Sequence, residues 1–179
     1  MNIHPSDFEE CLDTARALLS DGEEGSSLWD ANDLVNRALA LDPEAGDGWL
    51  LKCQILSALG DDVAALAAVS MAIRVEPDRA EVHYWHAAVL ADLERYDDSL
   101  AAIELAFRAI GPGDEWLIED LFYDKAAALD ALGCADAALA TYEDGLRRCP
   151  DSVILRSGLE PLRRQRARQR FTVIRGGLG

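Results

Sequence analysis

Apolar positions recur every three or four residues along most of this chain and are interrupted by short turn signals. The clearest stretch runs from Trp49 to Pro77, where two segments rich in Ala and Leu meet at Leu59-Gly60-Asp61. Gly adopts the left-handed conformation at little cost, and carboxylates suit a helix N-terminus, so this junction predicts the end of one helix and the cap of the next. The stretch therefore predicts a helical hairpin.

The same pattern recurs along the chain. Leu59-Gly60 matches Leu93-Glu94, 34 residues later, and Leu132-Gly133, a further 39 residues on. Each turn is followed by small residues at matched distances: Ala65 and Ala72, Ser99 and Ala106, Ala138 and Gly145. Pro77 is matched by Pro43, 34 residues earlier, and by Pro150 at the end of the last unit, whereas Pro112 of the middle unit falls one place late. One hairpin cannot bury its apolar face alone, so a recurring hairpin predicts a stack with a continuous core.

This period, with an early Trp, Leu-Gly at the turn, small residues where helices cross and a closing Pro, resembles the tetratricopeptide repeat over about 42–150. The middle unit departs from the pattern, because His83 takes the early aromatic position and Glu94 replaces the turn Gly. In the last unit Phe122 takes the aromatic position and Gly145 stands where Ala is usual. The resemblance implies an all-α, TPR-like helical-hairpin solenoid.

We expect one elongated domain over residues 1–162, followed by an Arg-rich C-terminal tail over 163–179. The domain divides into about four hairpins and a capping helix: a degenerate N-terminal hairpin over 6–43, repeats over about 46–77, 80–112 and 114–150, and the capping helix over 151–162. Solenoids need such a terminal helix to cover the last apolar face.

Turn and capping residues predict where several helices begin. We expect Ser6 to cap the first helix, residues 21–27 to form a loop before a second helix at Leu28, and Asp98 to begin the helix that ends at Ile110. Asp114 should cap the next helix, whose apolar stripe starts with Trp116 and Leu117. Asp151 should cap the last one, which Pro161 kinks or interrupts. We expect the last several residues to be mobile or bound.

Charge is distributed unevenly along the chain. The net charge is −16, but from Arg147 onward nine Arg face only two acids, a net of +7. The preceding residues carry 31 acids and eight bases, a net of −23. A body this acidic opposes binding to nucleic acid or anionic lipid and favours basic protein partners. The tail has three interpretations: a nucleic-acid contact, a solvated helix end, or a segment that pairs with the acidic face of this or a second copy.

Neither a secretory signal pattern nor an apolar run of about 20 residues is present, so we expect a cytoplasmic protein. The four cysteines, Cys11, Cys53, Cys134 and Cys149, lack metal-ligand or redox spacing, and we interpret them as buried small hydrophobes. The common nucleotide, metalloprotease and serine-hydrolase motifs are missing, so we expect no enzyme, catalytic residue or cofactor. His83 and His86, with Asp120 or Asp124, could bind a metal, but packing is the favoured interpretation and we assign no metal site.

The resemblance also implies a binding surface, because in this family the first helix of each hairpin lines a concave groove. The register selects these positions: Leu50, Gln54 and Ser57; Tyr84, Trp85, Ala88 and Asp92; Tyr123, Asp124, Ala127 and Asp130. The Lys, Arg and Asn clamp with which one subgroup holds a C-terminal carboxylate is missing from these positions. Aromatic and acidic side chains favour a peptide with apolar anchors beside Arg or Lys. Trp85 and Tyr123 could instead serve only to pack the hairpins together.

The function we expect is a non-enzymatic adaptor or scaffold that holds a segment of a partner protein in this groove. Two alternatives remain open. Small acidic proteins of about three such repeats shield secretion substrates in type III systems as dedicated chaperones, although an Arg-rich tail is not part of that pattern. The chain could also be a structural subunit that self-associates, with its segment 171–174 docking into a neighbour as a homo-oligomer contact.

Overall fold

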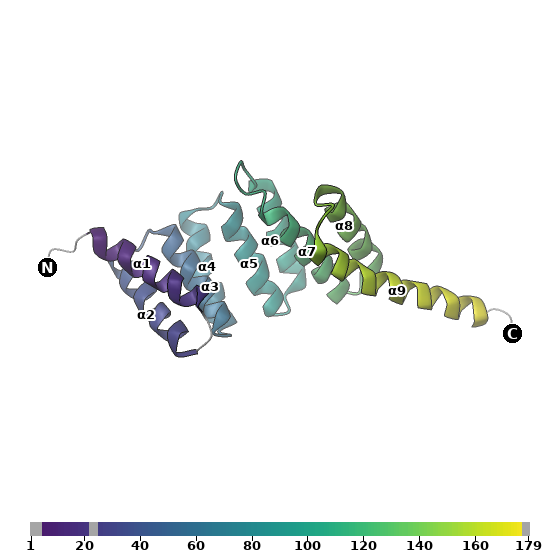
Figure 1. The fold of residues 1–179 in the computed structure, drawn as a ribbon, viewed down its shortest axis with the longest axis horizontal. Helices are drawn as coiled ribbons and strands as arrows, with labels where there is room; N and C mark the ends of the chain where they lie inside the picture. The colour runs from purple at the N-terminus through teal and green to yellow at the C-terminus, as the bar shows by residue number, and fades with distance from the viewer. Residues whose placement is uncertain (1–4, 22–24, 177–179) are drawn as a thin grey trace.

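The computed structural model describes residues 5–21 and 25–176, and within them the chain forms nine α-helices and no strand (Figure 1). This confirms the predicted all-α fold. The helices follow one another along the long axis, with the two ends of the chain at opposite ends of the molecule. Their bounds are α1 Pro5–Ser20, α2 Gly25–Leu41, α3 Gly46–Ala58, α4 Asp62–Val75, α5 Ala80–Asp92, α6 Tyr96–Ala109, α7 Leu117–Ala131, α8 Ala135–Arg148 and α9 Val153–Gly176.

Four hairpins and a final helix share a segmented core. The hairpins are α1/α2, α3/α4, α5/α6 and α7/α8, and each successive cluster of buried side chains joins one hairpin to the first helix of the next. In the last cluster α9 supplies Leu155, Leu159 and Leu162, which pack with Ala138 and Leu139 of α8. The predicted capping role of this helix follows, because it covers an apolar face that would otherwise meet water.

The three predicted turns have the same backbone geometry. Gly60, Glu94 and Gly133 all have positive φ, of 76°, 57° and 77°. At each turn the positive-φ residue donates its N–H to the carbonyl three residues back, and the next residue donates to the carbonyl five back, at 2.8 to 2.9 Å. This is the Schellman termination of a helix. Glu94 thus occupies the glycine position of the repeat in the glycine conformation.

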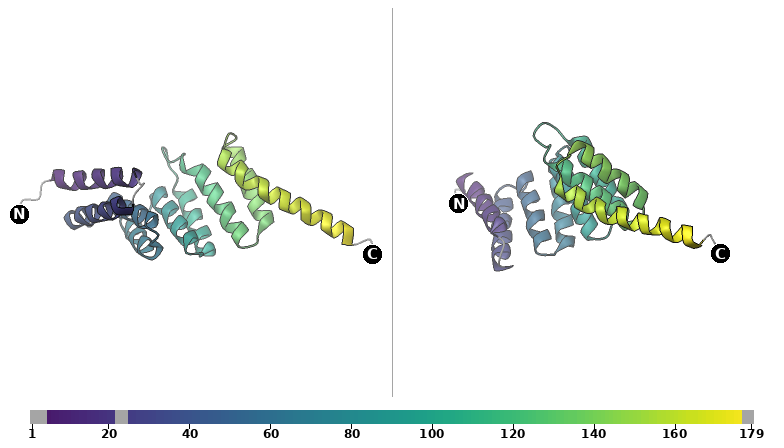
Figure 2. Two further views of the ribbon diagram at one scale, coloured as in Figure 1. Left: turned by 60° about the horizontal axis from the view of Figure 1, so that its bottom comes forward. Right: turned by 45° about the vertical axis from the view of Figure 1, so that its right-hand side comes forward.

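The odd-numbered helices lie closer together than the even-numbered ones. Within the described residues α1 contacts α3, α3 contacts α5, α5 contacts α7 and α7 contacts α9, whereas no two even-numbered helices touch. The two views in Figure 2 show the hairpins fanning along the stack. The odd-numbered helices therefore form the inner side of the curve, as the resemblance implied.

Several predicted helix starts were wrong by a few residues. α1 already includes Ser6, so Ser6 is not its cap. α2 begins at Gly25, so the end of the expected loop is helical. α6 begins at Tyr96 rather than Asp98. One cap is confirmed, because the Asp61 carboxylate accepts a hydrogen bond from the backbone N–H of Ala64 at 3.1 Å.

The start of α7 also differs from the prediction. Asp114 does not cap it, because its carboxylate accepts from the N–H of Gly111 at 3.0 Å and closes the loop between α6 and α7. The helix begins three residues later, at Leu117, which is fully buried. Trp116 precedes the helix and is 55 % exposed, so it does not begin the apolar stripe.

The last helix is capped by Ser152, not by Asp151. The Ser152 hydroxyl accepts from the N–H of Leu155 at 3.0 Å and donates to Glu119 of α7 at 2.6 Å. The helix then continues through Pro161 without interruption to Gly176. Proline removes the N–H that would bond to the Ser157 carbonyl, but both residues are exposed, so water can satisfy that carbonyl.

The predicted end of the capping helix at residue 162 is therefore wrong, since helix covers most of the Arg-rich tail. Residues 177–179 lie outside the described part of the chain. The division into a repeat domain and a tail stays a prediction. No helix in the described residues combines the length and apolar character needed to cross a bilayer.

The cysteines are free thiols with different environments. Cys11 and Cys53 are buried, Cys149 is half-buried and Cys134 is exposed. Burial raises the pKa of Cys53 to about 12, so this thiol stays protonated and packs as a small hydrophobe. The interpretation as buried residues fails for Cys134, which lies in the turn before α8, where no core covers it.

Candidate functional site: an acidic inner face

The inner face is defined here as the side chains of α3, α5 and α7 that the repeat register selected, together with Asp120. The structure places most of them at least partly in solvent. Asp92, Ala127 and Asp130 are exposed, and a larger group is half-buried: Gln54, Ser57, Tyr84, Trp85, Ala88, Tyr123 and Asp124. Leu50 is the exception. Its side chain is 3 % exposed and packs in the core between α3, α4 and α5, so a ligand on this face cannot reach it.

The aromatic residues of the inner face both pack and remain partly accessible. The rings of Tyr84 and Trp85 meet edge to face with centroids 5.6 Å apart, and those of Tyr123 and Tyr142 meet at 6.0 Å. Trp85 packs against the core of α3, α4 and α5, while Tyr84 packs against that of α5, α6 and α7. Packing therefore fixes the position of these rings while part of their surface stays in water.

Three carboxylates come together on α5 and α7. Burial, followed by the negative charges of Asp120 and Asp92, raises the pKa of Asp124 to about 6. The pKa of Asp120 is also raised, by burial and by Glu119, and that of Asp92 by burial and by Asp62. We call Asp92, Asp120 and Asp124 the acid cluster. Its members repel one another, and each loses hydration on folding.

Burial and the nearby negative charges also raise the pKa values of tyrosine hydroxyls beside the acid cluster. Burial, followed by the charges of Asp124 and Asp120, raises the pKa of Tyr84 to about 12. The pKa of Tyr142 on α8 rises to about 12 as well, through burial and then through Tyr123, Asp130 and Asp124. Both tyrosines thus remain neutral and able to donate hydrogen bonds. The negative potential extends from α5 across α7 to α8.

The ion pairs within the described residues lie away from the acid cluster. Arg79 contacts Asp47, Glu76 and Glu81 at 2.6 to 2.9 Å, and other Arg and Lys side chains pair with acids outside the inner face. Among the described residues, none of the ion pairs includes a member of the acid cluster or Asp130. The cluster therefore has carboxylate oxygens to offer to a cation from outside.

Of the two histidines considered as metal ligands, His83 is buried and His86 is half-buried. The Nε2 of His83 lies 2.6 Å from the Pro77 carbonyl oxygen, which links α5 to the loop that precedes it. Burial lowers the pKa of His86, and His83 and Arg95 lower it further, so it is neutral at pH 7. Within the described residues no group of three or more His, Cys, Asp or Glu side chains is arranged to hold a metal ion.

Sequence reasoning missed two features. Asp120 was not selected for the inner face, although it lies one helical turn before Asp124 and so shares its side of α7. Arg79 was also missed. It is a clamp that ties the loop between α4 and α5 to the start of α3, and hydrogen bonds to its three acids raise its pKa although burial lowers it. The sequence signal that could have identified Arg79 is a single basic residue among acidic residues in a loop.

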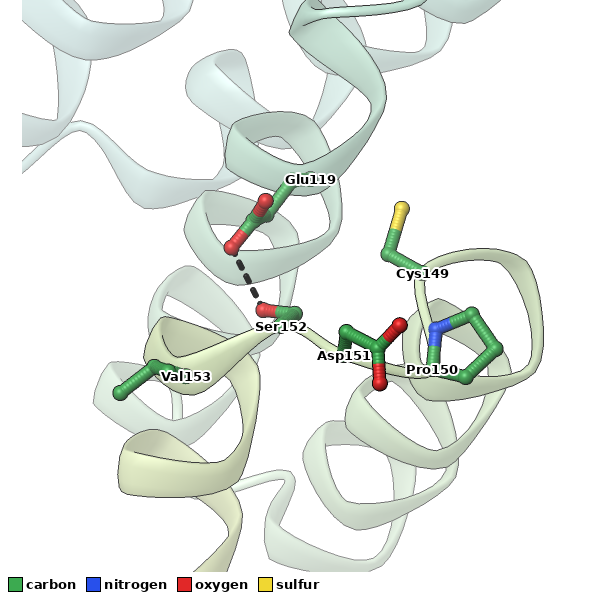
Figure 3. A pocket seen from close by; sticks show the side chains of 6 residues that line it. All are labelled: Glu119, Cys149, Pro150, Asp151, Ser152 and Val153. Atoms are coloured by element: carbon green, nitrogen blue, oxygen red, sulfur yellow. Dashed lines mark hydrogen bonds between the residues drawn. The ribbon is translucent and has the colours of Figure 1, made fainter.

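A hollow of 480 Å³ lies where α8 passes into α9 (Figure 3). Its wall consists of Glu119 and the residues of the junction, Cys149, Pro150, Asp151, Ser152 and Val153. The figure shows Glu119 reaching across from α7 to the Ser152 hydroxyl, which also caps α9. The polar groups here hold two helices together, and we assign the hollow a structural role.

Comparison with known proteins agrees with this architecture. No family model matches the chain. Protein FlbA of Caulobacter vibrioides is 26 % identical over 139 residues, which are 78 % of this chain but 22 % of FlbA, so the chain spans about a fifth of that relative.

Solved structures show the fold more clearly. MamA from Desulfovibrio magneticus RS-1, residue 41 to its end, superposes with a TM-score of 0.76 at 14 % identity over 97 % of this chain and 96 % of that one. TTC0263, described as a thermophilic TPR protein of Thermus thermophilus, superposes with a TM-score of 0.73 at 24 % identity over 89 % and 82 %. The chain is thus a tetratricopeptide-repeat-like protein in fold, an all-α solenoid of stacked helical hairpins.

Proposed function

We propose that this chain is a non-enzymatic interaction protein whose inner face binds a segment of a partner that carries Arg or Lys beside an apolar side chain. The observation that carries the proposal is the acid cluster: Asp124 has a pKa of about 6, and no cation among the described residues pairs with it or its neighbours. The chain holds charges together that repel one another, and a cation from a partner would relieve that repulsion.

The size of the pKa shift of Asp124 distinguishes the acid cluster from an ordinary group of solvated carboxylates. Each unit of pKa shift corresponds to about 1.4 kcal/mol, so keeping Asp124 ionised at pH 7 costs about 3 kcal/mol at most. A guanidinium or ammonium group placed against Asp124 and Asp120 would recover part of this energy on binding. An exposed surface carboxylate has no such cost to recover, because water already solvates it.

The neighbouring rings indicate what should accompany the cation. Tyr84 and Trp85 offer fixed, partly exposed aromatic surface, and such surface favours apolar side chains and stacked guanidinium groups. Ala88 and Ala127, one helical turn after Tyr84 and Tyr123, are small and at least partly exposed. Arg suits this surface better than Lys, because its planar group can stack on a ring and bind a carboxylate bidentately.

A binding titration tests the proposal. Fluorescently labelled peptides with Arg next to Leu or Phe should bind at pH 7.5, whereas the same peptides with Glu in place of Arg should not. Asp124→Asn should weaken binding at least fivefold, and Asp78→Asn, at an exposed loop acid, serves as the matched control and should leave it unchanged. Equal affinity of the wild type and Asp124→Asn for every peptide would refute the proposal.

A further inference from the structure

The second half of α9 projects beyond the packed part of the molecule. Leu155, Leu159 and Leu162 are buried against α7 and α8, and Leu162 is the last buried residue among those of α9 whose side chains the structure describes. From Arg163 to Arg168 every side chain is exposed. Figures 1 and 2 show the helix running on past α8. Apart from two ion pairs to α8, residues 163–168 gain little from their own chain, and helices with few tertiary contacts are marginal in water.

Four arginines of this half have described side chains, and they form two sets by their position around the helix. Arg163 pairs with Glu143 at 2.8 Å and Arg166 with Asp136 at 2.8 Å, so both contact α8 and hold α9 in place. Arg164, whose side chain is 75 % exposed, lies 3.7 Å from Glu160 on its own helix. Arg168 is one helical turn beyond Arg164 and therefore lies on the same side of α9. Both side chains of this second set are exposed to solvent.

We propose that the projecting half of α9, residues 163–176, docks on the inner face of a second copy of this chain. The inference rests on the proposed function and names the partner as this chain itself. Arg164 and Arg168 are spaced one helical turn apart, as Asp120 and Asp124 are on α7. Two cations on one helix thus match two carboxylates on another, and residues 163–176, with six arginines and no acid, match a body of −23.

The course of α9 favours a contact between copies over one within the chain. Ser152, at the start of α9, is bonded to Glu119, at the start of α7, so the two helices begin together. From there α9 runs away from α3 and α5, toward the C-terminal end of the molecule (Figures 1 and 2). In keeping with this, no arginine contributes to the raised pKa values of Asp120 and Asp124.

Such a contact joins two different surfaces and leaves one of each free, so it can add further copies in an open chain. Assembly should grow with protein concentration and weaken with salt, because it depends on exposed charges.

Sedimentation velocity on three full-length proteins tests the inference. The tail variant carries Arg164→Glu and Arg168→Glu, and the face variant carries Asp120→Asn and Asp124→Asn. Arg74→Glu with Arg148→Glu is a control that changes the net charge as much as the tail variant does. Wild type and control should exceed 19.5 kDa as concentration rises, whereas each variant alone stays at that mass. A mixture of the tail and face variants should form a dimer of twice that mass, because the mixture retains one intact copy of each surface.

Two results would overturn the inference: a wild type that stays at 19.5 kDa throughout, or variants that assemble as the wild type does. A mixture of variants that fails to dimerise would overturn it as well. The proposed function is judged separately from the peptide titration. If basic peptides still bind the wild type and not the face variant, the inner face remains a binding surface and only the second copy is excluded as its partner.

Discussion

Neutralising Asp124 should make the protein more stable at neutral pH, and the structure sets the size of the effect. Its pKa is raised from 3.8 to about 6, with burial as the largest cause. Asn has nearly the same shape and carries no charge, so Asp124→Asn removes the cost of an ionised, partly buried carboxylate. At about 1.4 kcal/mol per unit, the gain in the free energy of unfolding at pH 8 is about 3 kcal/mol at most.

The effect should depend on pH in a definite direction. The folded state holds the Asp124 proton more tightly than the unfolded chain does, so this group contributes stability below about pH 4 and loses it as pH rises through about 6. Wild type and Asp124→Asn should therefore be equally stable near pH 4 and diverge up to pH 8. Urea unfolding followed by circular dichroism at pH 4, 5, 6, 7 and 8 measures this difference.

A matched control separates this cause from a general reduction in charge. Asp78→Asn removes the same charge from an exposed loop position and should change stability by a few tenths of a kcal/mol. If Asp124→Asn were no more stable than the wild type at pH 8, or gained as much at pH 4 as at pH 8, the reasoning about the acid cluster would be refuted.

Three further substitutions test the fold by thermal or urea unfolding. Ser152→Ala should cost about 1 kcal/mol, because it removes the cap on the N–H of Leu155, and equal stability would mean that the cap is dispensable. Glu94→Gly should stabilise by up to about 1 kcal/mol, since its φ of 57° strains any residue with a side chain, and a loss of stability would contradict that reading of the turn. Gly145→Ala should cost about 1 to 2 kcal/mol, because the new methyl group would lie 2.8 Å from Cβ of Phe122, and a gain from helix propensity alone would show that the contact relaxes freely.

The stack of hairpins could be predicted from the sequence because its signals are local and repeat. The turn at Glu94 was placed correctly by register although its residue type argues against it. Two departures from the repeat also explain each other. Phe122 at the aromatic position leaves no room for a side chain at position 145, so Gly145 is required where Ala is usual.

Features that depend on contacts between distant residues could not be predicted. Asp151 and Ser152 are both good caps, and Ser152 is used because Glu119, 33 residues earlier, holds its hydroxyl. Trp116 was assigned to an apolar stripe because periodicity cannot show that a loop, closed by Asp114, lifts it from the core.

The candidate site, too, could be predicted only in its local features. The repeat register identified most of the inner face, but it included Leu50, which the stacking of α3 against α4 and α5 buries. It also could not show that Asp124 has a perturbed pKa, because that depends first on burial in the fold and then on charges that include Asp92 of a different helix.

The pKa of Asp124 in the free and the peptide-bound protein tests the central claim most directly. It can be followed by the chemical shift of the side-chain carboxyl carbon as pH is varied. The account predicts a value of about 6 in the free chain, and a fall of at least one unit when an Arg-containing peptide saturates the inner face. An ordinary pKa in the free chain, or a raised pKa that the bound peptide leaves unchanged, would contradict it.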